Sequence, residues 1–138
     1  MAVGELRAVV IDVNDLGAGE RFWAAVTGKQ LLFSGFNGRF SRLGRPDEGS
    51  ILLQLVPEAK VGPKDRVHLD LTVADLEVAV RAVEALDGRV KKPPSTHPSD
   101  DHPVLEWAVV LDPFDNEFCL VRSIGDATRA DFRYLPET

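Results

Sequence analysis

Apolar and polar residues alternate along two short runs of the chain that are almost copies of each other. The first run, RAVVIDVNDL, spans residues 7–16, and the second, RVHLDLTVADL, spans residues 66–76. Alternation with a period of two is typical of a strand that buries one face. Each run ends in an Asp-Leu pair, and the side chain of Asp15 or Asp75 can cap the helix that follows. The pattern therefore predicts a strand and then a helix at both places.

The alternation also assigns each strand residue to one of two faces, because residues two apart in a strand point to the same side. The apolar face carries Val9, Ile11 and Val13 in the first run and Val67, Leu69, Leu71 and Val73 in the second. The other face carries Ala8, Val10 and Asp12 in the first run and His68, Asp70 and Thr72 in the second. We expect a helix to cover the apolar face of each strand.

Two helices are predicted within residues 15–28 and 75–88. A shift of the chain by sixty positions aligns the two regions, including Gly28 with Gly88, so a glycine is expected near the end of each helix. The second helix has an apolar stripe and a charged face opposite, which is typical of a helix lying on a sheet. The stripe consists of Leu76, Val80, Val83 and Leu86, and the charged face of Glu77, Arg81 and Glu84. The first helix places Phe22, Trp23 and Val26 in a similar position.

Further β-like runs follow each helix. In the first half they span residues 30–36, 39–45 and 50–57, separated by the turn-forming stretches Asn37-Gly38 and 46–49. In the second half we expect a strand at 88–93, a polar, proline-rich loop at 93–103, and a hairpin of 106–113 with 116–123. The extra loop residues raise the shift to sixty-five, which matches Gln54 with Cys119. The predicted fold class is α+β, with one βαβββ module in each half.

The size of the chain favours one domain over residues 1–138, because 138 residues with 44% hydrophobic content build one core and not two. The first module spans about residues 5–57 and the second about 66–123, with a short polar segment between them. The tail, residues 124–138, carries no repeat and receives no role.

The charge of the chain limits the classes of partner that it can bind. A formal net charge of -6 disfavours nucleic acid and anionic membrane surfaces and tolerates a cationic ligand. The segment MAVGELRAVVIDV shows no basic region followed by a long apolar run, and no apolar run approaches the roughly 18 residues of a membrane span, so we expect a soluble, cytoplasmic protein. The single cysteine, Cys119, excludes an internal disulfide and leaves a buried apolar side chain, a ligand or a reactive thiol as alternatives.

Three local motifs, together with the two modules, resemble the vicinal oxygen chelate superfamily of glyoxalases, bleomycin-resistance proteins and extradiol dioxygenases. The motifs are the pair Phe22-Trp23, the HLDL strand at 68–71, and Trp107 followed by DPFDNEFC at 112–119; the resemblance covers residues 5–123. It implies that the modules form a curved, half-open barrel of mixed β-sheet, with helices on the convex side and a ligand cavity on the concave side. The superfamily hosts isomerisation, ring cleavage, thiol addition and sequestration, so the fold does not choose the chemistry.

The resemblance also implies where a metal would be held. Metal-dependent members place four ligands at inward strand positions, which match Ala8, Gln54, His68 and Cys119 here. Ala8 has no donor atom, and a catalytic metal generally needs about three ligands from His, Cys or carboxylate. No metal is therefore favoured. If a Zn, Ni, Fe or Mn ion is bound, His68, Cys119 and Gln54 are expected to hold it, with Asp12 and Asp70 too far along their strands to contribute.

A second group of possible metal ligands lies in the segment THPSDDHP. His97, Asp100, Asp101 and His102 stand close together in it. The prolines and serines around them favour a solvated loop or a lid over the cavity, so we do not expect a metal to be held there.

The function that we expect is the binding of a small organic metabolite or drug-like molecule in the cavity, without a complete metal site. The expected binding residues are His68, Gln54, Asp70, Asp12 and Cys119 for polar contacts, Trp107 and Phe40 for apolar contacts, and Arg42 as the nearest cation. Each of these residues also has a purely structural alternative, such as a hydrogen-bonded core histidine or a packed, inert thiol. The inward carboxylates would suit a cationic ligand.

Other functional classes remain open. The first alternative is a metal-dependent lyase, isomerase or dioxygenase, and another is metal-free acid–base catalysis by His68. A structural or regulatory module would have its cavity filled by side chains. The resemblance also implies a homodimer, since members of the superfamily often dimerise.

Overall fold

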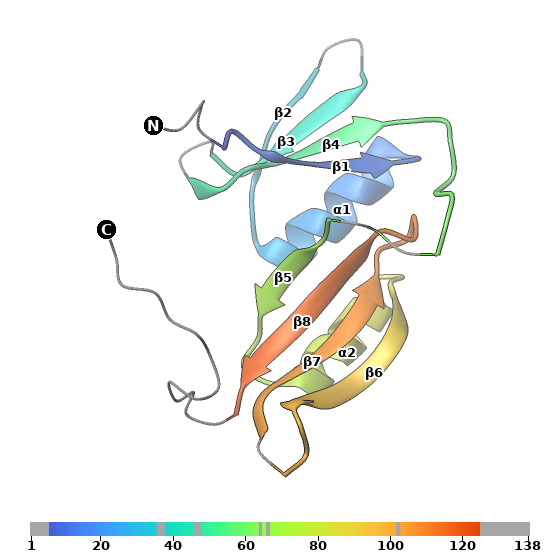
Figure 1. Ribbon diagram of the computed structural model, residues 1–138. Helices are drawn as coiled ribbons and strands as arrows, with labels where there is room; N and C mark the ends of the chain where they lie inside the picture. The colour runs from blue at the N-terminus through green and yellow to red at the C-terminus, as the bar shows by residue number, and fades with distance from the viewer. Residues whose placement is uncertain are drawn as a thin grey trace, which may run out of the picture. The chain divides into compact units, whose positions relative to one another are not determined.

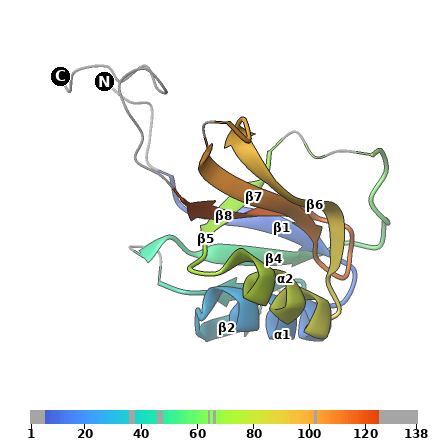
Figure 2. The ribbon, with the colours of Figure 1, turned by 90° about the horizontal axis from the view of Figure 1, so that it is seen from below.

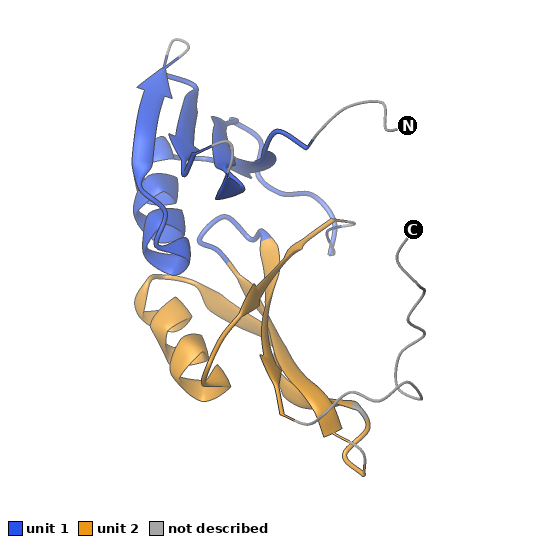
Figure 3. Ribbon diagram, turned by 90° about the vertical axis from the view of Figure 1, so that its left-hand side faces the viewer, with its two compact units in different colours: residues 1–65, 112–116 blue, residues 66–111, 117–138 orange. Residues whose placement is uncertain are grey.

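The chain folds into α+β structure, as predicted (Figure 1). The computed structural model describes residues 6–35, 38–45, 48–63, 65, 67–101 and 103–124. They form two compact units: unit 1 comprises residues 1–65 with 112–116, and unit 2 comprises residues 66–111 with 117–138 (Figure 3). The predicted turn at Asn37 and the segment from Gly125 onward fall wholly or partly outside the described residues.

Unit 1 has the predicted βαβββ order. Its elements are β1 (Val9–Val13), α1 (Leu16–Thr27), β2 (Leu31–Gly35), β3 (Phe40–Leu43) and β4 (Ile51–Leu55). The strands form a four-stranded sheet in the order β1-β4-β3-β2, in which β1 runs parallel to β4 and the other pairs are antiparallel.

Unit 2 repeats the same order and sheet topology. Its elements are β5 (Leu69–Thr72), α2 (Leu76–Ala85), β6 (Arg89–Pro98), β7 (Pro103–Leu111) and β8 (Glu117–Ser123). The sheet order is β5-β8-β7-β6, with β5 parallel to β8. The parallel pair requires a crossover, and in each unit the helix supplies it.

Each helix covers the face of its sheet that the sequence pattern predicts. Asp15 and Asp75 cap the two helices by accepting hydrogen bonds from the backbone N–H of Ala18 at 2.7 Å and of Val78 at 3.0 Å. In unit 1, Phe22 is buried against the sheet together with its helical neighbour Trp23. In unit 2, α2 lies along β6, β7 and β8 (Figure 2), and its stripe is buried at Leu76 and Val83 and half-buried at Val80 and Leu86. The opposite face of α2 is exposed.

The two helices end differently, which corrects the role predicted for the second glycine. Gly28 ends α1 with a left-handed φ of 70°, as expected. After α2 the left-handed residue is Asp87, with φ 71°, and Gly88 is needed for another reason. A Cβ on Gly88 would lie 2.5 Å from Val83 Cγ1 and 2.7 Å from the carbonyl oxygen of Leu111. Gly88 is therefore required where the end of the helix approaches the sheet closely.

Strand β6 extends further than the sequence predicted. The expected loop at 93–103 is wrong over most of its length, since β6 continues through Pro93 and Pro94 to Pro98, and β7 starts at Pro103. Proline is tolerated here because β6 is at the edge of the sheet, where a missing N–H need not break a second ladder. The pairing of β6 with β7 also shifts register between Lys92 and Ser95, where the prolines lie.

The strand pairing corrects the sixty-five-residue match between the two modules. Cys119 lies opposite Asp70, whereas Gln54 lies opposite Asp12. At the sixty-residue shift that aligns the two helix caps, the equivalent of Asp70 is Val10, and Val10 lies opposite Leu52. Leu52 is thus the equivalent of Cys119. The error is two residues, and because strand residues two apart share a face, the predicted faces are unaffected.

Asp112 fixes the short loop 112–116 within unit 1. Its side chain is fully buried and accepts hydrogen bonds from the indole N–H of Trp23 at 3.1 Å and from the side-chain amide of Asn116 at 2.8 Å. The backbone N–H groups of Phe114 and Asn116 also donate to it, each at 2.8 Å. Burial raises the pKa of the Asp112 carboxyl despite these four donors. The motif residues Trp23 and Asp112 therefore have a structural role.

Candidate functional site

The face of each sheet that points away from its helix is called its open face. Paired strand residues lie on the same face, so the register defines both faces. The open face of unit 2 carries Asp70, Thr72, Lys92, Ser95, His97, Trp107, Val109, Cys119 and Val121. The open face of unit 1 carries Val10, Asp12, Phe33, Phe40, Arg42, Leu52 and Gln54.

The burial of the strand residues agrees with the predicted faces. In β1, Ile11 and Val13 are buried while Asp12 is exposed, and in β5, Leu69 is half-buried while Asp70 is exposed. Val67 is an exception to the prediction, because it precedes β5 and is exposed. The alternation therefore holds only within the strand itself.

His68, Asp70 and Cys119 form one cluster on unit 2. Their possible ligand atoms all lie within 4.8 Å of one another. His68 Nδ1 is 3.3 Å from Asp70 Oδ1, and the side chains of His68 and Asp70 are 41% and 63% exposed. Cys119 is almost fully buried. The expectation that Asp70 is too far along its strand to join His68 and Cys119 is wrong, because β5 pairs in parallel with β8 at Asp70 and Cys119.

The surroundings of Cys119 favour the thiol over the thiolate. Burial raises the pKa of the Cys119 thiol, and the negative charge of Asp70, which also accepts a hydrogen bond from the thiol, raises it further. The positive charge of Lys92 acts in the opposite direction and is the weakest of these effects. A free thiol with a raised pKa is a poor nucleophile, so these surroundings support a packed thiol over a reactive cysteine.

The cluster has the donor set that a divalent transition metal requires. An imidazole, a carboxylate and a thiolate supply three ligands, and three protein ligands with an open position are typical of catalytic zinc sites. A bound cation would offset the repulsion between Asp70 and an ionised Cys119. Gln54, the third ligand expected from the sequence, belongs to unit 1, where its strand neighbours are Asp12 and Phe40.

Trp107 and His97 form an aromatic stack on the open face of unit 2. Their ring centroids are 3.3 Å apart and their planes differ by 3°. His97 Nε2 lies 2.8 Å from the hydroxyl oxygen of Ser95 on the same strand. The sequence placed His97 in a solvated loop, and the structure corrects this by placing it in β6. Ser95, Thr96 and His97 are all polar, so the sequence carries no period-of-two signal that could have predicted a strand here.

Among the described residues, Asp100 and Asp101 form no metal-binding group with His97. Asp100 and Asp101 are exposed in the turn after β6, and Asp100 accepts a hydrogen bond from the hydroxyl of Thr96. His102 lies outside the described residues.

Arg42 lies on the open face of unit 1 beside Phe33. Its guanidinium carbon is 5.5 Å from the centre of the Phe33 ring. The Arg42 Nε atom is buried and has no hydrogen-bond partner among the described residues. Phe40 and Gln54 form the next pair along the same two strands, and both are half-buried.

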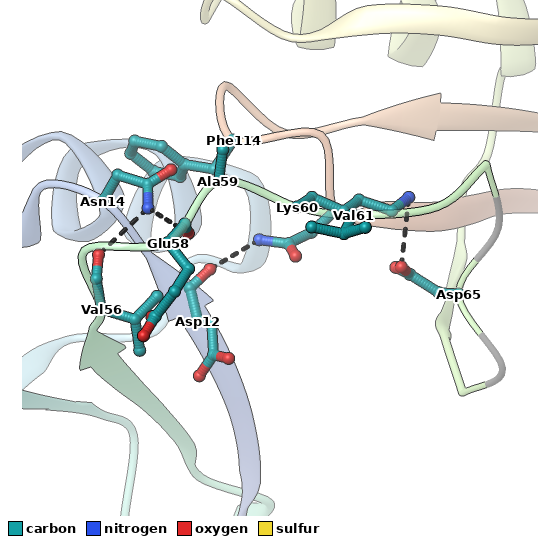
Figure 4. Close-up of a pocket in the computed structure, with 10 residues that line it drawn as sticks. Asp12, Asn14, Val56, Glu58, Ala59, Lys60, Val61, Asp65 and Phe114 are labelled. Atoms are coloured by element: carbon teal, nitrogen blue, oxygen red, sulfur yellow. Dashed lines mark hydrogen bonds and ion pairs between the residues drawn. The ribbon is translucent and has the colours of Figure 1, made fainter.

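Unit 1 also has a cavity of about 300 Å³ beyond the ends of β1 and β4 (Figure 4). Asn14 shapes one side by donating to the carbonyl oxygens of Val56 at 3.0 Å and Glu58 at 2.9 Å. Asn116 donates to the Asp12 carbonyl oxygen at 2.8 Å. Figure 4 shows the side chains of Asp12 and Glu58 extending to the same side. The sequence treated residues 57–65 only as a boundary between modules, because its polar composition carries no motif.

Two βαβββ units, each with a helix on one face of a mixed sheet, define the vicinal oxygen chelate fold. A model of the glyoxalase-like domain matches residues 8–121. The chain therefore belongs to the glyoxalase-like domain family, as the three sequence motifs predicted. A search of curated proteins found no match.

Solved structures agree with this assignment. A glyoxalase/bleomycin resistance protein/dioxygenase family enzyme from Burkholderia phytofirmans PsJN is 23% identical, with a TM-score of 0.66 over 88% of this chain and 100% of that one. The fosfomycin resistance protein FosX from Listeria monocytogenes is 12% identical, with a TM-score of 0.68 over 89% and 96%. FosX from Mesorhizobium loti is 17% identical, with a TM-score of 0.65 over 90% and 95%. At these identities the likeness concerns the fold.

Neither helix within the described residues is long and apolar enough to cross a bilayer.

Proposed function

We propose that the chain is a cytoplasmic protein that binds a small organic molecule on the open face of unit 2. The observation that carries this proposal is the stack of Trp107 on His97, on the face that also holds Asp70 and Cys119. A flat aromatic surface next to a few polar groups is the usual composition of a small-molecule site. The FosX relatives are named for fosfomycin resistance, which supports a small molecule as the ligand class.

Native mass spectrometry of the purified chain tests this proposal. We expect a non-covalent adduct in the mass range of a small metabolite, and we expect Trp107→Ala to lose most of it, because the variant lacks the stacking surface. Glu77→Gln is the matched control, since Glu77 is exposed in the first turn of α2 on the other side of the same sheet. An adduct that persists in Trp107→Ala would contradict a site on the open face of unit 2.

A metal-dependent enzyme is the second candidate, and the cluster of His68, Asp70 and Cys119 favours it. These residues would hold a divalent ion, which supplies Lewis-acid polarisation of a substrate oxygen when it is bound. The side chains of His68 and Asp70 are exposed enough for a substrate to reach them. The chain's own groups would orient the substrate, with Trp107 on the same face as a surface for its apolar part.

Metal analysis separates the two candidates. The chain is dialysed against Zn²⁺, Ni²⁺, Fe²⁺ or Mn²⁺, and the bound metal is measured after removal of excess ion. One equivalent that is lost in His68→Ala and in Asp70→Asn, and kept in Asp100→Asn, would support the metal-dependent candidate. A chain that stays metal-free with all four ions would exclude that candidate and leave binding alone.

A further inference from the structure

Arg42 is a half-buried charged side chain that has no counter-charge among the described residues. It lies in the middle of β3, where its paired neighbours are Phe33 on β2 and Leu52 on β4. Among the described residues no carboxylate is paired with it and no hydrogen bond reaches it, and its contact is with the Phe33 ring at 5.5 Å. Its guanidinium carries a positive charge and N–H donors only, so it needs an acceptor from another group.

The lack of a hydrogen-bond partner for Arg42 Nε among the described residues lowers the stability of the folded chain. A charge that is partly withdrawn from water is normally paired, and a buried N–H without an acceptor loses the hydrogen bond that it made to water. The contact with an aromatic ring offsets only part of this loss. The acceptor is therefore expected outside the described residues, and a bound ligand can supply it.

The residues around Arg42 indicate what carries that acceptor. Phe33 and Leu52 flank the guanidinium, and Phe40 and Gln54 form the next pair along the sheet. Apart from Gln54 these neighbours are apolar, so they suit the body of an organic molecule better than a hydrated inorganic ion. Asp12, the nearest acidic residue in the register, lies on β1, two strands away from Arg42, which is roughly 10 Å at the usual strand spacing.

We propose that Arg42 is the recognition group for an organic anion, with a carboxylate or phosphonate bound to the guanidinium and an apolar or aromatic body lying over Phe33 and Phe40. The planar guanidinium presents two parallel N–H donors, and an oxyanion can accept from both together. The inference rests on the proposed function and goes beyond it, because Arg42 lies on the open face of unit 1 and the Trp107 stack on that of unit 2. It replaces the cationic ligand that the acidic composition suggested.

The test uses three aromatic probes of similar shape: benzoate, phenylphosphonate and neutral benzyl alcohol. Nuclear magnetic resonance of the ¹⁵N-labelled full chain follows the Arg42 Nε–H signal, which is assigned by its loss in Arg42→Lys. We expect benzoate or phenylphosphonate to shift this signal and to bind at least about tenfold more tightly than benzyl alcohol, because a charge-assisted pair is lost in the alcohol. The anion that binds more tightly shows whether the site prefers a planar carboxylate or a tetrahedral phosphonate.

Variants make the assignment specific. Arg42→Gln should weaken binding of the preferred anion at least about tenfold, and Arg42→Lys should weaken it less, because it keeps the charge and loses the planar fork. Arg21→Gln is the control, since Arg21 is exposed on α1 on the other side of the same sheet. A thermal melt of each variant confirms that it is folded.

Three results would overturn the inference. The first is that benzyl alcohol binds as tightly as the anions, and the second is that Arg42→Gln binds the anions unchanged. The third is that inorganic phosphate binds as tightly as the aromatic anions, because the site would then recognise an ion and not an organic molecule. Benzyl alcohol that binds on the open face of unit 2 without involving Arg42 would leave the proposed function intact while removing this inference. The adduct measurement described above tests the proposed function separately.

Discussion

Asp112 shows how a single residue of a family motif can serve the fold and not the chemistry. Its carboxylate accepts from Trp23, Phe114 and Asn116, and all of these groups belong to unit 1. Its removal would leave the buried indole N–H of Trp23 without an acceptor. We expect Asp112→Ala to lower the free energy of unfolding by about 3 kcal/mol, measured by urea denaturation. Asp101→Ala is the control, because Asp101 is exposed, and a similar loss there would contradict the assignment.

The pH dependence of stability provides a second test at Asp112. Burial raises the pKa of its carboxyl above the ordinary value of 3.8, so the folded chain keeps this proton to higher pH than the unfolded chain does. The stabilisation from this group is therefore complete below pH 3.8 and is lost as the pH rises through the pKa of the folded state. The unfolding free energy of the wild type minus that of Asp112→Asn should fall as the pH rises from 3.8. A difference that rises with pH would contradict the direction of the shift.

Cys119 is predicted to resist alkylation in the folded chain. Burial and Asp70 raise the pKa of its thiol, which lowers the fraction of reactive thiolate at neutral pH. Asp70→Asn removes the negative charge and should make the reaction with iodoacetamide faster at a given pH, while Asp100→Asn should leave it unchanged. The rate is followed by mass spectrometry as a function of pH. Equal rates in all three proteins would show that Asp70 does not act on Cys119.

At the scale of the element, the contact between α2 and its sheet depends on Gly88. An alanine there would place its Cβ 2.7 Å from the backbone oxygen of Leu111, which cannot move without disturbing β7. We expect Gly88→Ala to cost about 3 kcal/mol in unfolding free energy. Gly17→Ala is the matched control, since a Cβ on Gly17 meets the mobile end of Arg21 at 3.3 Å, and its effect should stay within about 1 kcal/mol. Equal effects of the two substitutions would contradict the packing argument.

The strands and helices were largely predictable because local signals determine them. The caps at Asp15 and Asp75, the period of two in β1 and β5, and the apolar stripe of α2 all act within a few residues. The course of β6 was not predictable, because prolines normally end a strand and only its position at the sheet edge makes Pro93 and Pro94 acceptable. Edge position is a property of the whole sheet and is not visible locally.

The candidate site was predictable only in part, for the same reason. Parity grouped Asp70 and Cys119 on one face, but only the register shows that they meet, and that His68, just before β5, joins them. Register depends on the pairing of β5 with β8, which are far apart in the sequence. The stack of His97 on Trp107 likewise arises from pairing across strands, and so does the position of the Arg42 Nε, which has no partner among the described residues.

At the scale of the whole molecule, the loop 112–116 shows that the units are not simply the two halves of the sequence. The loop joins two strands of unit 2, yet it belongs to unit 1.

Light scattering during size-exclusion chromatography tests the homodimer that the family resemblance implies. We expect twice the mass of one chain, and exposed apolar side chains in unit 1, at Leu31, Leu32 and Leu55, are consistent with a covered surface. A single-chain mass at about 100 μM, a concentration far above ordinary affinities, would contradict it.

The central claim is that the open face of unit 2 binds a small organic molecule, and the two tryptophans provide the most direct test. Trp107 lies on the open face of unit 2, whereas Trp23 is buried and its indole N–H donates to Asp112. The indole N–H signals of the ¹⁵N-labelled chain are recorded during titration with a library of small aromatic and polar compounds, and Trp107→Phe assigns them. We predict that binding compounds shift the Trp107 signal and leave the Trp23 signal in place. A library that never moves Trp107 would contradict the account.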